Sequence, residues 1–238
     1  MGFKRLLQNN FVIFGFAAYN LDMLPRRKVF LLFLLSSFLI VSCSTATPPP
    51  PTPQVVSVYA SFAAEPWLTE LYDCAAQQPN VILSRVDDSN SAEIVLQIGE
   101  PAVTSFAYQI DEEQILIVTH RQSPIQNLTL EQAQALFMGL EDASVQVWVY
   151  ASDADVQKVF DQFVMEGRSV ASSAQVAVSP QQMSDTLVNE PNAVGILPRH
   201  WKVSDMREVY SAATVPVLAL TKNEPQGTIK ELIACLQK

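Results

Sequence analysis

The stretch QILIVTHRQSPIQNLTLEQAQALFMGL, residues 114–140, holds a complete strand, connection and helix start. Residues 114–120 are rich in β-branched and apolar residues and predict a buried strand. Thr129 and Gln132 have the spacing of a capping box, which starts a helix. The apolar residues that follow share one face of that helix: Leu130, Ala133, Leu136 and Phe137.

The segments before this stretch predict more strands than helices. Strands are expected at 55–61, 80–88, 92–99 and 104–110. A helix is expected between the first two of these strands, beginning near Pro66. The acidic run 111–113 predicts a turn between the strand at 104–110 and the strand at 114–120.

The segments after the stretch alternate strand and helix. Strands are expected at 145–152, 192–198 and 214–222. After the strand at 145–152, a helical stripe is formed by Val156, Val159, Phe160, Phe163 and Val164, and Gly167 ends the helix. A short helix is predicted to open at Ser179, and a capping box of Thr228 and Glu231 to start a last helix at 229–236. This order predicts an α/β protein with largely parallel sheets, whose ligands bind beyond the carboxyl ends of strands.

The N-terminal region predicts export and anchoring. An apolar run at 29–41 follows the basic cluster 26–28, and it is too short to cross a bilayer, so 1–42 is predicted to be a signal peptide. Met23 begins a complete signal peptide by itself, and we expect translation to start there. The sequence Ile-Val-Ser-Cys at 40–43 resembles the bacterial lipobox, which implies cleavage before Cys43 and lipidation of its sulfur. The alternative is a buried membrane cysteine.

That reading places the protein on the extracytoplasmic face of the cell membrane. The proline-rich segment in 43–54 would act as a semi-rigid linker between the lipidated cysteine and the folded body.

The charge of the chain excludes some partners. Five of the 15 basic residues and one of the 24 acidic residues precede Cys43, so the remainder carries ten basic and 23 acidic residues. Such a surface repels phosphate backbones, and we expect no nucleic-acid partner. His120 and His200 form no ligand motif, so neither a metal nor a cofactor is expected. The sequence also lacks a Gly-x-Ser-x-Gly elbow and a Walker loop, and we expect no enzymatic activity.

Residues 115–238 resemble phosphate-type ABC transporter substrate-binding proteins. Beyond the opening stretch, the matching segments are VQVWVYASDADVQKVFDQFVMEG (145–167), PNAVGILPRHW (191–201) and VPVLALTKNEPQGTIKELIACLQ (215–237). The resemblance implies a two-lobed type 2 periplasmic-binding-protein fold with a central cleft. It divides the body into lobe 1, from 55–118 plus 211–238, and lobe 2, from 119–210.

The chain departs from the family at its anion site. The loops SFAAEP (61–66) and ASDADV (151–156) replace the family's Ser/Thr-rich and Ser-Gly-Thr loops. The segment VDDSNSAEI (86–94) passes almost directly between strands, so a family helix is missing and lobe 1 is reduced. The acids Glu65, Asp153 and Asp155 lie at helix starts, where carboxylates are stabilised. No arginine is placed by the sequence to offset them, although Arg121 and Arg199 are candidates for the cleft edge.

The resemblance also implies the site and one disulfide. It predicts that the cleft is lined by Ser61, Phe62, Gly99, Glu100, Ser152 and Asp153. It brings the last helix back to the first, so Cys74 and Cys235 are expected to be bridged, the alternative being two buried free thiols.

Two functions follow from this reading. The first is a monomeric solute-binding lipoprotein of an ABC-type importer, in contact with a permease and with phosphate disfavoured as its solute. The second is a binding-protein-like lipoprotein that senses or contacts another protein and transports nothing.

Overall fold

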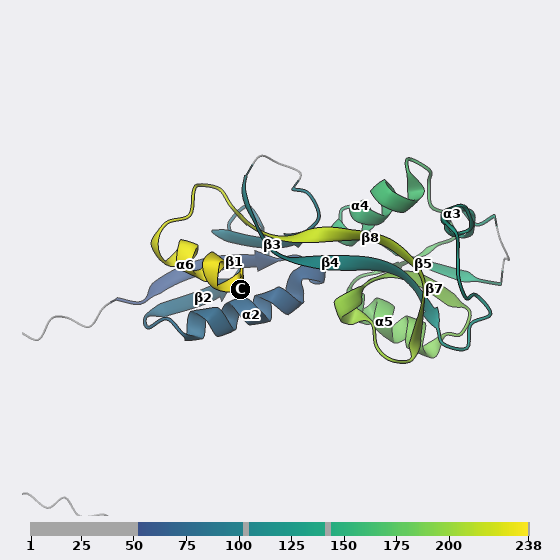
Figure 1. Cartoon of the computed structure of the whole chain (residues 1–238), viewed down its shortest axis with the longest axis horizontal. Coiled ribbons are helices and arrows are strands. Elements are labelled where there is room, and N and C mark those ends of the chain that lie inside the picture. Colours follow the sequence, from purple (N-terminus) through teal and green to yellow (C-terminus); the bar gives the residue numbers. More distant parts are fainter. Residues whose placement is uncertain (1–51, 102–104, 141–143, 238) are drawn as a thin grey trace, which may run out of the picture. The chain divides into compact units, whose positions relative to one another are not determined.

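A single mixed sheet runs through the part of the chain that the computed structural model describes, residues 52–101, 105–140 and 144–237 (Figure 1). The expected signal peptide, Cys43 and most of the linker lie outside the described residues. The strand order is β2-β1-β3-β8-β4-β7-β5-β6. The strands are β1 (Gln54–Ala60), β2 (Val81–Arg85), β3 (Ile94–Ile98), β4 (Phe106–His120), β5 (Gln146–Tyr150), β6 (Gln175–Ala177), β7 (Ala193–Pro198) and β8 (Met206–Thr221).

Helices cover this sheet in two groups. The α-helices are α2 (Glu65–Ala76), α3 (Leu130–Phe137), α4 (Asp155–Phe160), α5 (Pro180–Asn189) and α6 (Gly227–Leu236). Short helical segments are η2 (Phe62–Ala64), η3 (Asp161–Met165) and η4 (Arg199–Trp201). We call β1–β3 with α2 and α6 the first lobe, and β5–β7 with α3, α4 and α5 the second lobe.

The expectation of parallel sheets is correct only within each lobe. β1 is parallel to β2 and β3, and β5 is parallel to β6 and β7. Between them, β4 and β8 are antiparallel to each other and to their outer neighbours β7 and β3. The lobe boundaries expected at 118/119 and 210/211 fall inside these two long strands.

The turn expected at 111–113 is wrong, because these residues lie inside β4. Asp111, Glu112 and Glu113 pair with residues 217–215 of β8. Acidic residues are poor strand formers, but a complete ladder to β8 satisfies the backbone groups and overrides that local preference. Glu112 is exposed, whereas the next side chain, that of Glu113, is buried.

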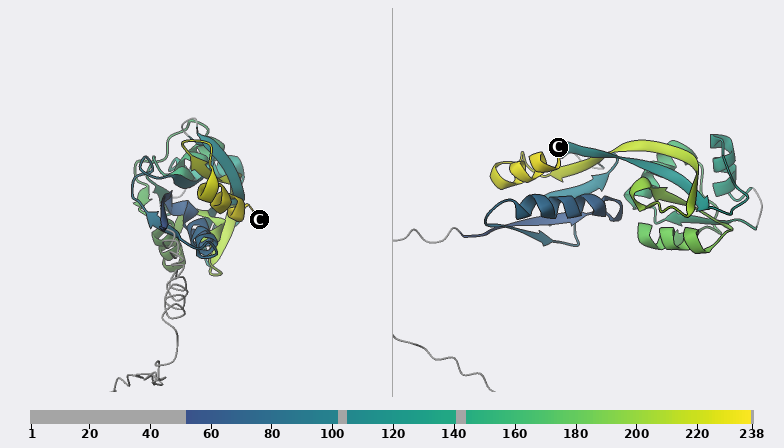
Figure 2. Two further views of the ribbon diagram at one scale, coloured as in Figure 1. Left: turned by 90° about the vertical axis from the view of Figure 1, so that its left-hand side faces the viewer. Right: turned by 60° about the horizontal axis from the view of Figure 1, so that its bottom comes forward.

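The first lobe is built on α2 and α6, which lie side by side and are joined by a disulfide (Figure 2). The Cα atoms of Cys74 and Cys235 are 6.0 Å apart. The capping box predicted at the start of the last helix is wrong. Helix α6 begins earlier, at Gly227, and the Thr228 hydroxyl donates instead to Gln54 Oε1 at 2.7 Å.

The reduced first lobe has one uncovered sheet face. Residues 86–93, between β2 and β3, contain bends and turns and no helix. Val55 and Ile82 are paired neighbours on that face, and they are 56% and 50% exposed. The side chains on the opposite face of β1 are fully buried, as shown by Val56 and Val58.

The second lobe contains a π-helical turn that the apolar stripe of the sequence did not predict. The capping box of Thr129 and Gln132 is confirmed at the start of α3. Helix α4, however, continues into the π-helical turn η3. Because a π turn adds a residue, Phe163 rotates outward to 44% exposure, whereas Val164 and Met165 are fully buried.

The described body has its own hydrophobic core, and by their contacts residues 51–238 form one unit. Within the described ranges, none of the helices has both the length and the apolar character that a membrane span requires.

Candidate functional site

A cavity of about 580 Å³ lies at the carboxyl ends of strands from both lobes. The first lobe contributes residues from the ends of β1 and β3 and from the loop after β2. The second lobe contributes the ends of β5 and β6 and the start of α4. Polar and charged side chains that line it are Tyr59, Ser61, Ser89, Gln97, Tyr150, Asp153, Asp155 and Lys158.

Three of the six expected site residues line this cavity. Ser61 and Phe62 follow β1, and Asp153 lies in the loop between β5 and α4. Loops that follow strand ends face the cleft in this arrangement, which is why the positions agree with the sequence pattern.

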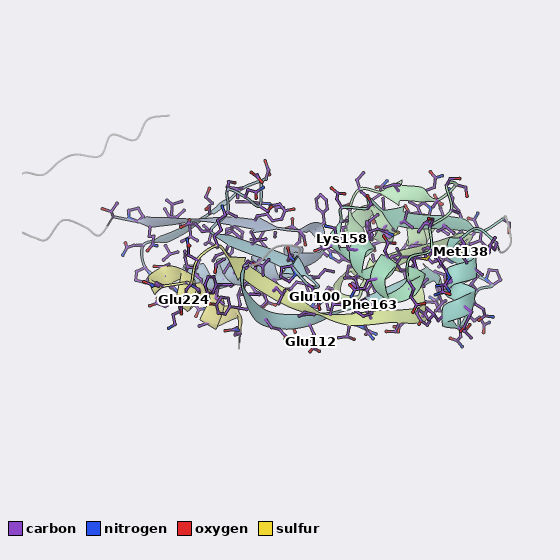
Figure 3. All side chains as sticks on the ribbon, turned by 90° about the horizontal axis from the view of Figure 1, so that it is seen from above. Glu100, Glu112, Met138, Lys158, Phe163 and Glu224 are labelled. Carbon is purple, nitrogen blue, oxygen red and sulfur yellow. A yellow bond between two sulfur atoms is a disulfide. The ribbon has the colours of Figure 1, made fainter. Side chains whose placement is uncertain are left out.

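The other three expected residues lie elsewhere. Gly99 is held away because its N–H donates to the Pro216 carbonyl at 2.8 Å, and a Cβ on it would lie 3.0 Å from Val159. Glu100 is exposed and is not among the lining residues (Figure 3). Ser152 lies at the tip of a turn closed by the bond from the Ala154 N–H to the Ala151 carbonyl, and it faces a separate hollow.

The carboxylate of Asp155, at the start of α4, accepts three hydrogen bonds at the edge of the cavity. Its Oδ2 accepts hydrogen bonds from the Ser61 hydroxyl and from the Ile98 N–H, the latter at 3.2 Å. Its Oδ1 accepts from the Val156 N–H at 2.9 Å. Burial raises the pKa of the Asp155 carboxyl above its ordinary value, and these hydrogen bonds oppose that shift only in part. The carboxylate therefore links the second lobe to the first.

Tyr150 places an unpartnered hydroxyl in the same region. Its side chain is 5% exposed, and within the described residues the hydroxyl has no hydrogen-bond partner. Burial, and then the charge of Asp155, raise the pKa of Tyr150 well above its ordinary value, so the phenol stays protonated. A buried hydroxyl without a partner is costly, which makes Tyr150 a natural contact for a bound molecule.

The charges that face the cavity are few. Asp153 and Asp155 are acidic, and Lys158 of α4, labelled in Figure 3, is the basic residue among the lining residues. On the other wall, burial and then the charges of Asp155 and Asp153 raise the pKa of Tyr59, and the charge of Arg85 opposes this shift.

The prediction that no basic residue pairs with Glu65 is wrong. Arg85, from the end of β2, forms an ion pair with it, and Arg85 Nη1 lies 3.1 Å from Glu65 Oε2. The two residues are 20 positions apart, and only the return of β2 beside β1 brings them together.

The two arginines proposed for the cleft edge lie outside the cavity. Arg121 pairs with Asp205, and Arg199 pairs with Glu208. Neither arginine lines the cavity, so neither offsets its acids.

The mouth of the cavity is apolar. Phe62, Val176 and Val178 all line it and are 59%, 54% and 72% exposed. Exposed apolar side chains that gather at one opening indicate contact with a molecule that has apolar surface. Among the described residues, no group of His, Cys, Asp and Glu could hold a metal ion.

Sequence reasoning did not place several lining residues in the cleft, among them Tyr59, Gln97 and Tyr150. Tyr59 and Gln97 belong to the sheet face that no helix covers, and the period-two alternation of β1 and β3 would have placed both there. Tyr150 ends a buried strand, where sequence alone does not separate a core tyrosine from a site tyrosine.

Comparison with solved structures identifies the fold. A putative phosphate ABC transporter substrate-binding protein from Clostridium perfringens, solved with bound phosphate, is 17% identical with a TM-score of 0.68, covering 77% of this chain and 93% of its own. A phosphate transport receptor from Vibrio cholerae is 15% identical with a TM-score of 0.59, covering 78% and 94%. The regulatory domain of CcmR from Synechocystis, in complex with 2-PG, is 9% identical with a TM-score of 0.60, covering 77% and 95%.

These likenesses define the class of architecture: a type 2 periplasmic-binding-protein-like fold, shared by transport receptors and by regulatory domains. No protein-family model matches the chain. No curated protein matches it either.

Proposed function

We propose that this protein is an extracytoplasmic solute-binding lipoprotein of an ABC-type importer. The observation that carries the proposal is the cavity built from strand ends of both lobes, with the buried, unpartnered Tyr150 hydroxyl in its lining. Its size suits a small organic solute. Support comes from the shared fold with proteins described as phosphate transport receptors.

The anchoring part of the proposal rests on sequence. The lipobox-like residues 40–43 and the proline-rich segment after them would hold the body on the outer face of the cell membrane, within reach of a permease. The body would bind its solute as a monomer and would need no cofactor.

The charges of the cavity disfavour phosphate as the solute. Asp153 and Asp155 line the cavity, and Lys158 is the basic residue among its lining residues. Two unit charges 4 Å apart repel by about 4 kcal/mol at an effective dielectric of 20, nearly three decades in affinity. A neutral or cationic solute with apolar surface fits better, because it can use the tyrosines and the apolar mouth.

A second function is favoured by one observation. The hydrogen bond from the Ser61 hydroxyl to Asp155 joins the two lobes through side chains of the protein itself. A body closed in this way, with an apolar opening, suits a lipoprotein that senses or contacts another protein.

The direct test is calorimetry on the soluble body, residues 51–238, with amines, amino acids, sugars and inorganic phosphate. We expect micromolar binding of a neutral or cationic compound and no comparable binding of phosphate. Tyr150→Phe removes only the phenolic hydroxyl group. It should weaken that binding about tenfold or more, because the bound compound loses a buried hydrogen bond. Tyr72→Phe is the matched control, since Tyr72 is 41% exposed on α2 and does not line the cavity. Absence of binding across the panel would favour the sensor function.

A further inference from the structure

The contact between Asp155 and the first lobe has an unusual origin. Strand β1 pairs with β3 only as far as Ala60 and Leu96, and the Ser61 N–H then donates to the Leu96 carbonyl at 2.9 Å. In a continued parallel ladder, the next donor would be the Ile98 N–H and its acceptor the Ser61 carbonyl. That carbonyl instead accepts from the Ala64 N–H at 3.0 Å, because the chain turns into η2.

The end of the ladder therefore leaves two donors that converge on one place. They are the Ile98 N–H and the Ser61 hydroxyl, and both donate to Oδ2 of Asp155. A buried N–H without an acceptor costs free energy, and a charged oxygen is the acceptor that satisfies it best.

A third polar group, the hydroxyl of Tyr150, lines the same cavity as Asp155. The Tyr150 hydroxyl is buried without a partner, and the charge of Asp155 contributes to the raised pKa of its phenol. Two groups, the Ser61 hydroxyl from the loop after β1 and the Ile98 N–H from β3, thus donate to a single carboxylate oxygen, and the Tyr150 hydroxyl at the end of β5 lines the same cavity without a partner.

We propose that the Asp155 carboxylate is a built-in occupant of an oxyanion site formed by the Ser61 hydroxyl and the Ile98 N–H. In this position Asp155 determines the specificity of the cavity, because it takes the place of an inorganic oxyanion and excludes one from solution. This inference concerns the chain's own carboxylate, so it stands whether or not the wild-type protein transports a solute.

The consequence is that the chain holds a masked site for phosphate or sulfate. With the carboxylate present, an entering oxyanion meets both a filled position and a like charge. With the carboxylate removed, the Ser61 hydroxyl and the Ile98 N–H lose their acceptor and can donate to an entering oxyanion. The resident Lys158 would then be opposed by Asp153 alone.

Asp155→Ala tests this against a matched control, Asp153→Ala. Both variants remove one carboxylate from the same cavity, but no hydrogen bond ties the exposed Asp153 side chain to the rest of the described chain. We expect Asp155→Ala in the soluble body to bind inorganic phosphate at least about tenfold more tightly than wild type does by calorimetry. Asp153→Ala should change phosphate affinity by less than about threefold, because it leaves the position filled.

Three further variants keep the result decisive. Asp155→Asn removes the charge but keeps the volume, so it should gain much less than Asp155→Ala. Adding Ser61→Ala to Asp155→Ala should remove most of the gain, because the hydroxyl donor is lost. If Asp155→Ala does not fold, Asp155→Ser gives the same comparison with a small polar side chain.

Three outcomes would overturn the proposal. They are tight phosphate binding by wild type, an equal gain in Asp153→Ala and Asp155→Ala, or no gain in a folded Asp155→Ala. The proposed solute role fails by a different measurement, namely the absence of any binding compound for wild type.

Discussion

Nδ1 of His200 lies 2.8 Å from Oε2 of Glu113, a carboxylate that is 1% exposed in the middle of β4. The other oxygen, Oε1, accepts from the N–H groups of Gln114 and Arg199 at 2.8 and 3.1 Å. The His200 ring packs edge-on against Trp67 of α2, with centroids 4.6 Å apart. A buried acid in one crossing strand thus organises a second contact between the lobes, away from the cavity.

Glu113→Ala should therefore destabilise the protein strongly. The substitution removes the buried acceptor of two backbone N–H groups and of the His200 imidazole. We expect the free energy of unfolding, measured by urea denaturation, to fall by about 2–4 kcal/mol. The neighbouring Glu112→Ala is the control, because Glu112 is exposed, as Figure 3 shows, and should change stability by less than about 0.5 kcal/mol. Equal effects of the two variants would contradict this role.

Loss of the Cys74–Cys235 disulfide should also be costly. The bond spans 161 residues, and the chain-entropy account of so long a loop gives about 5 kcal/mol, an upper value for a real protein. The double variant Cys74→Ser with Cys235→Ser should lose a large part of that free energy of unfolding. Wild type measured under reducing conditions should match it, and a loss below about 1 kcal/mol would show that the bond constrains little.

Asp155 predicts a particular dependence of stability on pH. Its pKa is raised in the folded protein, so the carboxyl holds its proton more tightly when folded than when unfolded. Its contribution is therefore fully present below the unfolded pKa of about 3.9 and is lost as the pH rises through the raised folded value.

The measurement compares wild type with Asp155→Asn at each pH, so that Tyr59, Tyr150, Asp153 and Lys158 contribute to both. We expect the unfolding free energy of wild type, minus that of the variant, to decrease as the pH increases from 4 to 7. A difference that grows over this range would mean that the hydrogen bonds outweigh burial.

Lipid anchoring at Cys43 stays a prediction from sequence. Cys43→Ala should either release the protein from the membrane or leave its signal peptide uncleaved, because the acyl chains have no sulfur to join. Cell fractionation and mass spectrometry of the mature N-terminus measure both outcomes. Membrane retention of a correctly processed Cys43→Ala protein would remove the basis for the anchor.

The local sequence pattern was sufficient to predict those helices and strands that depend on residues close together in the sequence. The capping box at Thr129 depends on residues three apart, and the strands of each lobe carry their own apolar alternation. The acidic run at 111–113 was misread because its structure depends on pairing with residues 215–217, about a hundred positions away. Phe163 was misassigned because a π turn leaves no mark on an apolar stripe.

The site was only half predictable for the same reason. Ser61, Phe62 and Asp153 follow strand ends, and the topology alone puts such residues at a cleft. The key bond between Ser61 and Asp155 joins residues 94 positions apart, and the pairing of Arg85 with Glu65 also arises only in the folded chain. The sequence pattern predicts only that Asp155 lies at the start of a helix. The hydrogen bonds of the folded chain show that its carboxylate contacts the first lobe.

The long antiparallel pairing of β4 with β8 sets how the two lobes can move. Both crossing segments belong to one hydrogen-bonded ladder, with register shifts between Gln109 and Asp111, Ile115 and Leu116, and Ile117 and Val118. Neither can stretch or swing alone, because that would break the bonds to the other. Any change in the angle between the lobes must therefore bend or twist both strands together, and we expect that bending to occur at the irregular steps of the ladder.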